Sequence, residues 1–225
     1  MATSRERSGP PRRAVVRALL DGYGRTYAQE AGIRLRDTPQ PLYRLLVLAD
    51  LLSTRIRAGV AVAAARELSA AGLRDPRRMA AARWQERVDA LGRGGYRRYD
   101  ESTATRLGEG AELLLREYRG DLRRLRDRAG GDTARIGGLL QEFPGVGPAG
   151  ADIFLREAQA VWPRPAPYVD GKALQGARSL GLPDSPAALV RASDGADPAH
   201  LASALVRVAL DRSAPGRVLE AAAAA

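Results

Sequence analysis

The stretch that constrains this chain most reads LLQEFPGVGPAGADIFL, from Leu139 to Leu155. Apolar residues on both sides are spaced as in amphipathic helices, and Pro144-Gly145-Val146-Gly147 lies between them. Glycine lets the backbone adopt positive φ and approach another group closely, so we expect a tight turn here. Ala151 is small enough to let the flanking helices pack together. The pattern predicts a helix, a hairpin turn and a second helix over about residues 135–161.

The hairpin turn is also a candidate anion site. Backbone N–H groups at the start of a helix lack an acceptor within the helix, and the helix dipole favours negative charge there. Gly145, Val146, Gly147 and Ala149 would supply such N–H groups to a phosphate. An ordinary helix–helix turn can carry the same glycines, so the turn alone leaves both interpretations open.

The composition favours a basic, helical protein. Lys and Arg number 36 against 26 Asp and Glu, a net charge of +10, and Lys172 is the single lysine. Such a surface suits nucleic acid or an acidic membrane, although a solvated charged surface would look the same. Apolar residues make up 45% and aromatic residues 5% of the chain, so the core must consist largely of Leu, Val and Ala. We expect Tyr43, Trp84 and Trp162 to lie in that core.

Several classes of site are excluded or disfavoured. The chain has no cysteine, which excludes disulfides, thiolate metal sites and cysteine-ligated iron–sulfur clusters. His200 is the single histidine, which disfavours a histidine zinc site or a Ser-His-Asp triad. No apolar run approaches the length of a membrane span and the first residues lack a signal-peptide core, so we expect a cytoplasmic protein.

Helix signals follow one another along most of the chain, with neither strand alternation nor an internal repeat. We therefore predict an all-α fold, with one domain over residues 11–218. A flexible arm is expected at residues 1–10, and a tail or cloning scar at residues 219–225, where five alanines end the chain. The expected helices cover about residues 13–30, 42–52, 60–70, 103–118, 134–142, 149–161 and 198–211, with further starts after Asp75 and Asp170.

Two more motifs make the pattern specific. Leu51-Leu52-Ser53 ends a strongly apolar run, and Tyr168-Val169-Asp170 follows the hairpin. Together with the hairpin they resemble the helix-hairpin-helix DNA glycosylase superfamily, the endonuclease III-like enzymes, over about residues 40–180. The resemblance implies a bundle of two helical lobes with a cleft between them. The N- and C-terminal helices would form one lobe and about residues 40–135 the other.

The resemblance makes Asp170 the catalytic carboxylate. Breaking an N-glycosidic bond builds positive charge on the sugar, and an ionised acid can stabilise that charge or activate a water molecule. Asp170 also follows a proline-rich segment and precedes an expected helix, where aspartate is a good N-cap. Both interpretations remain open at this residue.

The chain departs from the family pattern in three places. Family members that also cleave the strand carry a lysine where this chain has Ala149, so lyase activity is not expected. The family's Val-Asp-Thr-His stretch is Val169-Asp170-Gly171-Lys172 here, which suggests Lys172 as a phosphate contact, a solvent-exposed side chain or a displaced nucleophile. The cysteines of the iron–sulfur cluster are absent.

Taking a base out of the stack requires a group that fills the gap. By resemblance, Arg55 lies where relatives place such a side chain, and residues 94–99 lie where they place a second wedge. Tyr96 could stack on a base while Arg97 and Arg98 contact phosphates. A basic solvated loop with one buried tyrosine is the alternative.

The leading hypothesis is a monofunctional DNA N-glycosylase, a hydrolase of base excision repair that flips and excises a damaged or mispaired base. A non-catalytic DNA lesion- or structure-binding protein and a helical adaptor that binds protein are the alternatives. The resemblance implies a nucleoid-associated protein on damaged double-stranded DNA, with no membrane partner. We expect a monomer, because no heptad pattern or long exposed apolar face stands out. It implies no cofactor other than a monovalent cation held by backbone carbonyls of the hairpin.

Overall fold

The structure, a computed structural model, describes residues 10–162, 164 and 166–224. These residues form helices and connecting turns without any strand, which confirms the predicted all-α fold. Apart from Pro10, the predicted N-terminal arm lies outside the described residues, as do Pro163 and Pro165 of the proline-rich connection. The chain divides into two compact units, one spanning Thr26–Ala166 and the other joining the residues up to Arg25 with those from Pro167 onward.

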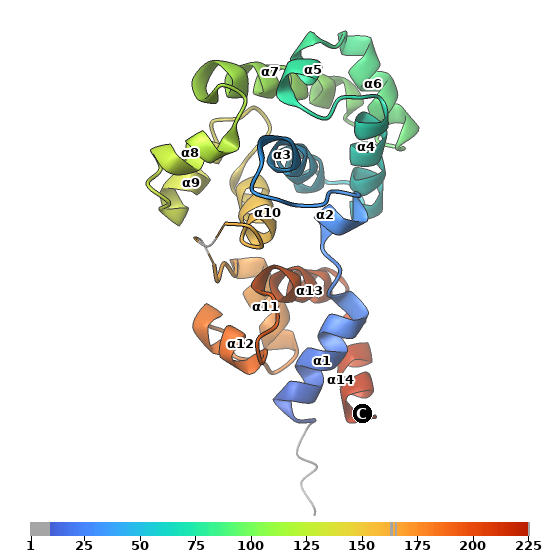
Figure 1. The fold of residues 1–225 in the computed structure, drawn as a ribbon. Coiled ribbons are helices and arrows are strands. Elements are labelled where there is room, and N and C mark those ends of the chain that lie inside the picture. Colours follow the sequence, from blue (N-terminus) through green and yellow to red (C-terminus); the bar gives the residue numbers. More distant parts are fainter. Residues whose placement is uncertain (1–9, 163, 165, 225) are drawn as a thin grey trace, which may run out of the picture. The chain divides into compact units, whose positions relative to one another are not determined.

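The unit Thr26–Ala166 is built around one buried helix, α3 (Figure 1). Its elements are α2 (Tyr27–Glu30), α3 (Pro39–Ser53), α4 (Ala58–Ala70), α5 (Pro76–Ala81), α6 (Trp84–Arg93), α7 (Asp100–Tyr118), α8 (Leu122–Arg128), α9 (Thr133–Leu140) and α10 (Pro148–Ala158). Helices α4, α8 and α10 pack against α3. Because neighbours lie on several sides of α3, a leucine-rich sequence without a polar stripe fits this position.

The first predicted helix is interrupted in the structure. Helix α1 (Arg12–Tyr23) ends at Gly24, and α2 begins after Thr26, whose hydroxyl accepts from the N–H of Gln29. The buried carboxylate of Glu157 accepts two further N–H groups at the start of α2, from Tyr27 and Ala28, both at 2.7 Å. The prediction of one continuous helix over residues 13–30 was therefore wrong, because these caps stabilise a new helix start after residue 26.

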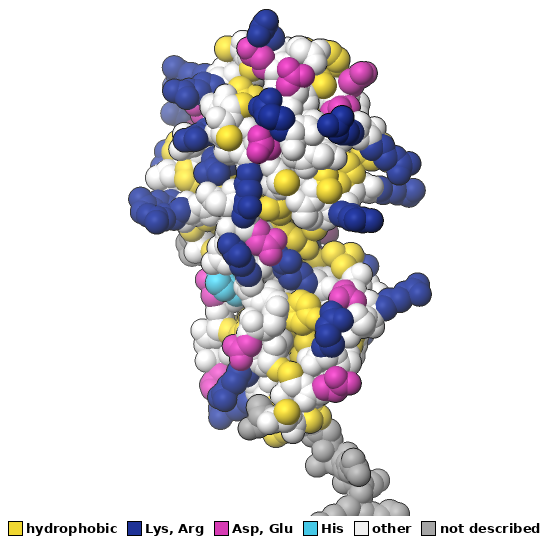
Figure 2. All heavy atoms as spheres, turned by 90° about the vertical axis from the view of Figure 1, so that its right-hand side faces the viewer, with side chains coloured by type: hydrophobic (Ala, Val, Ile, Leu, Met, Phe, Trp, Pro, Cys, Tyr) yellow, Lys and Arg dark blue, Asp and Glu magenta, His cyan; other side chains and the backbone are white. Residues whose placement is uncertain are grey.

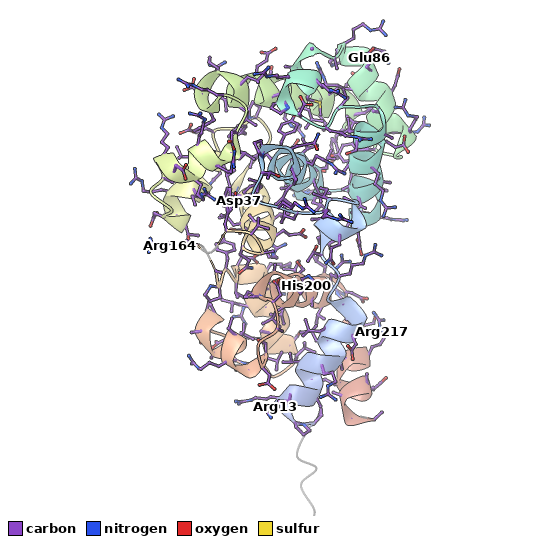
Figure 3. All side chains as sticks on the ribbon, in the orientation of Figure 1. Arg13, Asp37, Glu86, Arg164, His200 and Arg217 are labelled. Atoms are coloured by element: carbon purple, nitrogen blue, oxygen red, sulfur yellow. The ribbon has the colours of Figure 1, made fainter. Side chains whose placement is uncertain are left out.

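A polar cluster on the same unit fixes the segment before α3. Asp37, labelled in Figure 3, accepts from the indole N–H of Trp162 at 3.0 Å and from Arg126 at 2.9 Å. The guanidinium of Arg126 also lies over the Trp162 ring, and Trp162 packs edge-on against Phe154. Trp162 and Tyr43 are buried as predicted, whereas Trp84 is 41% exposed. The prediction of a buried Trp84 was wrong because this ring lies at the start of a surface helix, where it donates to Thr105.

The second unit consists of α1, α11 (Gly171–Ser179), α12 (Pro186–Ala192), α13 (Pro198–Leu210) and α14 (Ala214–Ala223). Helix α1 packs against α13 and α14, and α11 packs against α13 (Figure 1). The tyrosine hydroxyl of Tyr23 on α1 accepts from Arg217 on α14. The expected tail is helical as far as Ala223, with Ala222 buried, so residues 219–223 belong to the fold. Alanine is the best helix former, and a short alanine run therefore continues α14.

Two short helices, α8 and α12, were not predicted from the sequence. Asp121 N-caps α8 by accepting from Arg123, and Pro186 stands in the first turn of α12. Each has seven residues, which is too short for a clear periodic pattern.

The contact between α11 and α13 gives a stability prediction. Gly176 lies so close to α13 that an added Cβ would overlap the carbonyl oxygen of Leu205, whereas nothing lies near a Cβ added at Gly171. We expect Gly176→Ala to lower the free energy of unfolding by about 1–3 kcal/mol, because backbone atoms would have to shift. Gly171→Ala, on the same helix, should leave it unchanged or raise it by up to about 1 kcal/mol. Hydrogen exchange of α11 and α13 amides checks this, and equal protection in both variants would contradict it.

Candidate nucleic-acid interface

The predicted hairpin is present between α9 and α10. Helix α9 ends at Leu140, and Gly145 adopts φ +86°, a left-handed conformation that favours glycine. The N–H of Val146 donates to the carbonyl of Phe143 at 3.0 Å, which closes the turn. Gly147 is the N-cap of α10 and Pro148 fills the first helical position, where the lack of an N–H costs no hydrogen bond.

The outer side of the turn presents uncommitted backbone donors. Gly145, Gly147 and Ala149 are exposed, and no residue within the described part of the chain accepts from their N–H groups. They lie at the N-terminus of an eleven-residue helix, which is an electrostatically favourable place for an anion. Val146 differs from the prediction: its side chain is buried and its N–H is used within the turn. It therefore shapes the turn and offers a phosphate neither its side chain nor a free N–H group.

The structure brings the Leu51-Leu52-Ser53 motif against the hairpin. Leu51 is buried, and Ser53 ends α3 with its hydroxyl donating to the carbonyl of Asp50 at 2.8 Å. A Cβ added at Gly150, in the first turn of α10, would lie 3.6 Å from the Cβ of Ser53. Small residues thus let the start of α10 and the end of α3 meet. Two of the three sequence motifs are neighbours in one unit.

The predicted wedge loops are joined to each other by a hydrogen bond. The hydroxyl groups of Tyr96 and Thr54 lie 2.6 Å apart, which links the segment after α3 to the segment before α7. The Tyr96 side chain is 0% exposed, so the prediction that it stacks on a base or wedges the duplex is wrong. Its ring reaches inward, and it anchors the loop that displays Arg97 and Arg98. Arg55, in the other loop, is exposed as well.

An ion pair that was not predicted from the sequence lies directly beneath the hairpin. Asp50 on α3 is 3% exposed, and its Oδ1 lies 3.7 Å from Nη2 of Arg106 on α7. A Cβ added at Gly145 would overlap Nε of Arg106 and lie 2.5 Å from Oδ1 of Asp50. The turn therefore closes over this pair only because Gly145 has no side chain. The available signal was an aspartate within an otherwise apolar helical run.

The surroundings of Asp50 disfavour its charged form. Neither carboxylate oxygen accepts a hydrogen bond from any described residue, and the buried Nε of Arg106 and hydroxyl of Tyr43 are likewise unpaired there. Burial raises the pKa of Asp50 to about 6, although the positive charge of Arg106 opposes the rise. A cavity of about 20 Å³, lined in part by Tyr43, Asp50, Arg106 and Phe143, adjoins the pair.

In the other unit, Asp170 is the N-cap of α11. It is 7% exposed, and its Oδ1 accepts from the N–H groups of Lys172 at 2.8 Å and Ala173 at 3.0 Å. The capping interaction considered from sequence is therefore present, and it fixes the direction of the carboxylate. Lys172 is exposed, and its Nζ donates to Gln175 at 3.0 Å. The catalytic role of Asp170 and the phosphate contact of Lys172 stay predictions.

Charge and composition by themselves do not locate the interface. On the face shown in Figure 2, Lys and Arg side chains are scattered with acidic side chains between many of them.

In the part of the chain that the structure describes, no helix has the length and apolar character of a membrane span. The described residues likewise contain no group of three or more histidine or acidic side chains arranged to hold a metal ion. The monovalent cation implied by the resemblance would rest on backbone carbonyls and stays a prediction.

Comparisons with known proteins give a structural similarity and no match in sequence. No protein-family model matches the chain, and no curated protein matches its sequence. The chain is similar to endonuclease III in the solved structure entitled "Structure of a Trapped Endonuclease III-DNA Covalent Intermediate: Estranged-Adenine Complex". The two are 18% identical, the match covers 85% of this chain and 83% of that chain, and the TM-score is 0.46.

The raised pKa of Asp50 predicts how stability varies with pH. The folded chain binds this proton more tightly than the unfolded chain, where the pKa is 3.8. The resulting stabilisation is complete below pH 3.8 and is lost as the pH rises through about 6. Between about pH 4.5 and 7.5, the wild type should lose about 2 kcal/mol more of its free energy of unfolding than Asp50→Asn. Denaturant unfolding at both pH values tests this, and parallel losses would contradict it.

Proposed function

We propose that this protein is a monofunctional DNA N-glycosylase acting on damaged or mispaired bases in double-stranded DNA. The observation that carries the proposal is the exposed turn at Gly145, Gly147 and Ala149, whose N–H groups have no acceptor among the described residues. A helix N-terminus with such donors suits a backbone phosphate, and the net charge of +10 suits a polyanion.

The neighbouring loops supply side chains of the right chemistry. Arg55, Arg97 and Arg98 are exposed on two loops that the Thr54–Tyr96 hydrogen bond joins within the same unit as the hairpin. Arginine contacts phosphates through several donors at once, and a long side chain can fill the gap left by a flipped base. In this proposal the hairpin and the arginines hold the backbone while the base leaves the stack.

The chemistry is assigned to Asp170. Hydrolysis breaks the bond between C1′ of the sugar and the base nitrogen, and a water oxygen forms the new bond to C1′. One proton of the water stays on the new C1′ hydroxyl, and the other passes to the departing base nitrogen. An ionised carboxylate lowers the barrier by stabilising the positive charge that develops on the sugar or by accepting a proton from the water. Ala149 at the family's lysine position supports hydrolysis without Schiff-base strand cleavage, because alanine has no amine.

A second candidate function is a non-catalytic DNA lesion- or structure-binding protein. The observation that favours it is the capping geometry of Asp170, because a carboxylate oxygen that accepts two N–H groups already serves the fold. Gly171-Lys172 in place of the family's Thr-His points the same way. Such a protein would bind the same DNA and release no base.

Phosphate binding at the turn is tested by adding a negative charge there. Ala149 and Ala134 are exposed and each stands second in its helix, in α10 and α9. A glutamate in the first turn suits both helices, so neither substitution should unfold the protein. We expect Ala149→Glu to weaken binding to a duplex by about tenfold or more, with a shallower salt dependence, and Ala134→Glu to change it little.

The DNA-binding measurement is made with two duplexes, one intact and one with a stable abasic-site analogue. Preference for the abasic duplex supports lesion processing, whereas equal affinity for both would exclude lesion recognition. An equal loss of DNA affinity in Ala149→Glu and Ala134→Glu would show that the hairpin is not part of the DNA interface.

Catalysis is tested by Asp170→Asn with a panel of lesion-bearing duplexes. Asparagine caps helices as well as aspartate does, so the fold of α11 should persist. We expect base release to fall by about a hundredfold or more while DNA affinity stays, because the charge that stabilises the transition state is lost. Base release that is undiminished in Asp170→Asn removes Asp170 from the mechanism. No release by the wild type on any duplex, with binding intact, favours the non-catalytic candidate.

A further inference from the structure

The pair Asp50–Arg106 lies against the inner side of the hairpin at Gly145. Nε of Arg106 and Oδ1 of Asp50 occupy the space where a side chain of residue 145 would be. Arg106 is only partly buried, with 26% of its side chain exposed, while Asp50 is almost completely enclosed. The described residues offer no hydrogen-bond partner to either oxygen of Asp50 or to Nε of Arg106. A buried ion pair whose carboxylate accepts no hydrogen bond contributes little to stability, so its presence calls for another explanation.

The same pair also reaches the two arginine loops. Nη2 of Arg106 donates to the hydroxyl of the buried Thr103 at 3.0 Å. Burial raises the pKa of Tyr96, and hydrogen bonds with Thr54 and Thr103 oppose the rise. The hydroxyl groups of Tyr96 and Thr54 lie 2.6 Å apart. The polar chain thus runs from the hairpin turn to the segments that carry Arg55 and Arg97. All of these residues belong to one compact unit.

We propose that Asp50 and Arg106 are positioning residues of the DNA interface. They hold the turn at Gly145 in a fixed position relative to both arginine loops. Their balanced charges also set how strongly the turn attracts a phosphate. With both groups ionised, the pair adds no net charge beneath the turn. Removing the negative member leaves the Arg106 guanidinium to act on the bound phosphate through a poorly hydrated interior, where charges interact strongly. This inference rests on the proposed binding of DNA phosphates by the hairpin.

The test compares three variants: Asp50→Asn, Arg106→Gln and the double substitution. Asp50→Asn should tighten binding to an intact duplex by about threefold to tenfold at neutral pH, because a positive charge is released beneath the turn. Arg106→Gln should weaken binding by a similar factor. The double variant, which restores a neutral pair, should return close to the wild-type affinity. A purely structural role predicts losses in all three, so a gain in Asp50→Asn is diagnostic.

Two controls separate charge from folding. Glu112→Gln, on the exposed side of the same helix α7, makes the same change in net charge away from the pair. It should leave the affinity within about twofold of the wild type, because solvent screens an exposed charge. Circular dichroism and thermal unfolding identify any variant that does not fold. The Arg106→Lys variant then tests positioning, because lysine keeps the charge but lacks the planar donors that reach Thr103.

The outcome with Ala149→Glu distinguishes the two proposals. If Ala149→Glu and its control bind DNA equally, the hairpin does not hold the phosphates and the proposed function fails at its first step. If Ala149→Glu loses affinity while Asp50→Asn binds no more tightly than Glu112→Gln, the hairpin binds DNA but the buried pair does not tune it. That result overturns the inference alone.

Discussion

The absence of a side chain at Gly145 is the constraint on which the candidate interface depends. The turn adopts positive φ there and comes down onto Asp50 and Arg106, where any Cβ would overlap the guanidinium. This approach brings the start of α10 against the end of α3 at Gly150 and Ser53. The N–H groups on the other side of the turn are then left exposed at a helix N-terminus.

The central helix α3 couples these features because it serves two purposes. Its leucines form the core of the unit Thr26–Ala166, while Asp50, Ser53 and Thr54 at its C-terminal end contact the hairpin and the loop before α7. A rigid core helix is a precise support for a binding site, because its packed side chains resist displacement. The carboxylate proposed for catalysis stands on a different support, the N-terminus of α11 in the other unit.

The cost of a buried charge also bears on why this pair is present. Burying Asp50 without hydrogen bonds disfavours its ionised form, and replacing the whole pair by apolar residues of similar volume would cost the fold little stability. Stability therefore gives little reason for an acid and a base beneath the turn. Their presence is explained by a requirement on the charge and position of the turn, which is the role inferred for the pair.

The sequence alone determined the all-α class, the position of the hairpin, the core placement of α3 and the cap at Asp170. These follow from local rules: helical periodicity, the conformational freedom of glycine, and side chains that cap a helix two or three residues ahead. Tertiary structure decided the roles of Tyr96 and of the Asp50–Arg106 pair, and the place of α14 against α1. Tyr96 could face solvent or Thr54, which is 42 residues away in the sequence. The outcome depends on contacts between distant segments, which a local sequence pattern cannot predict.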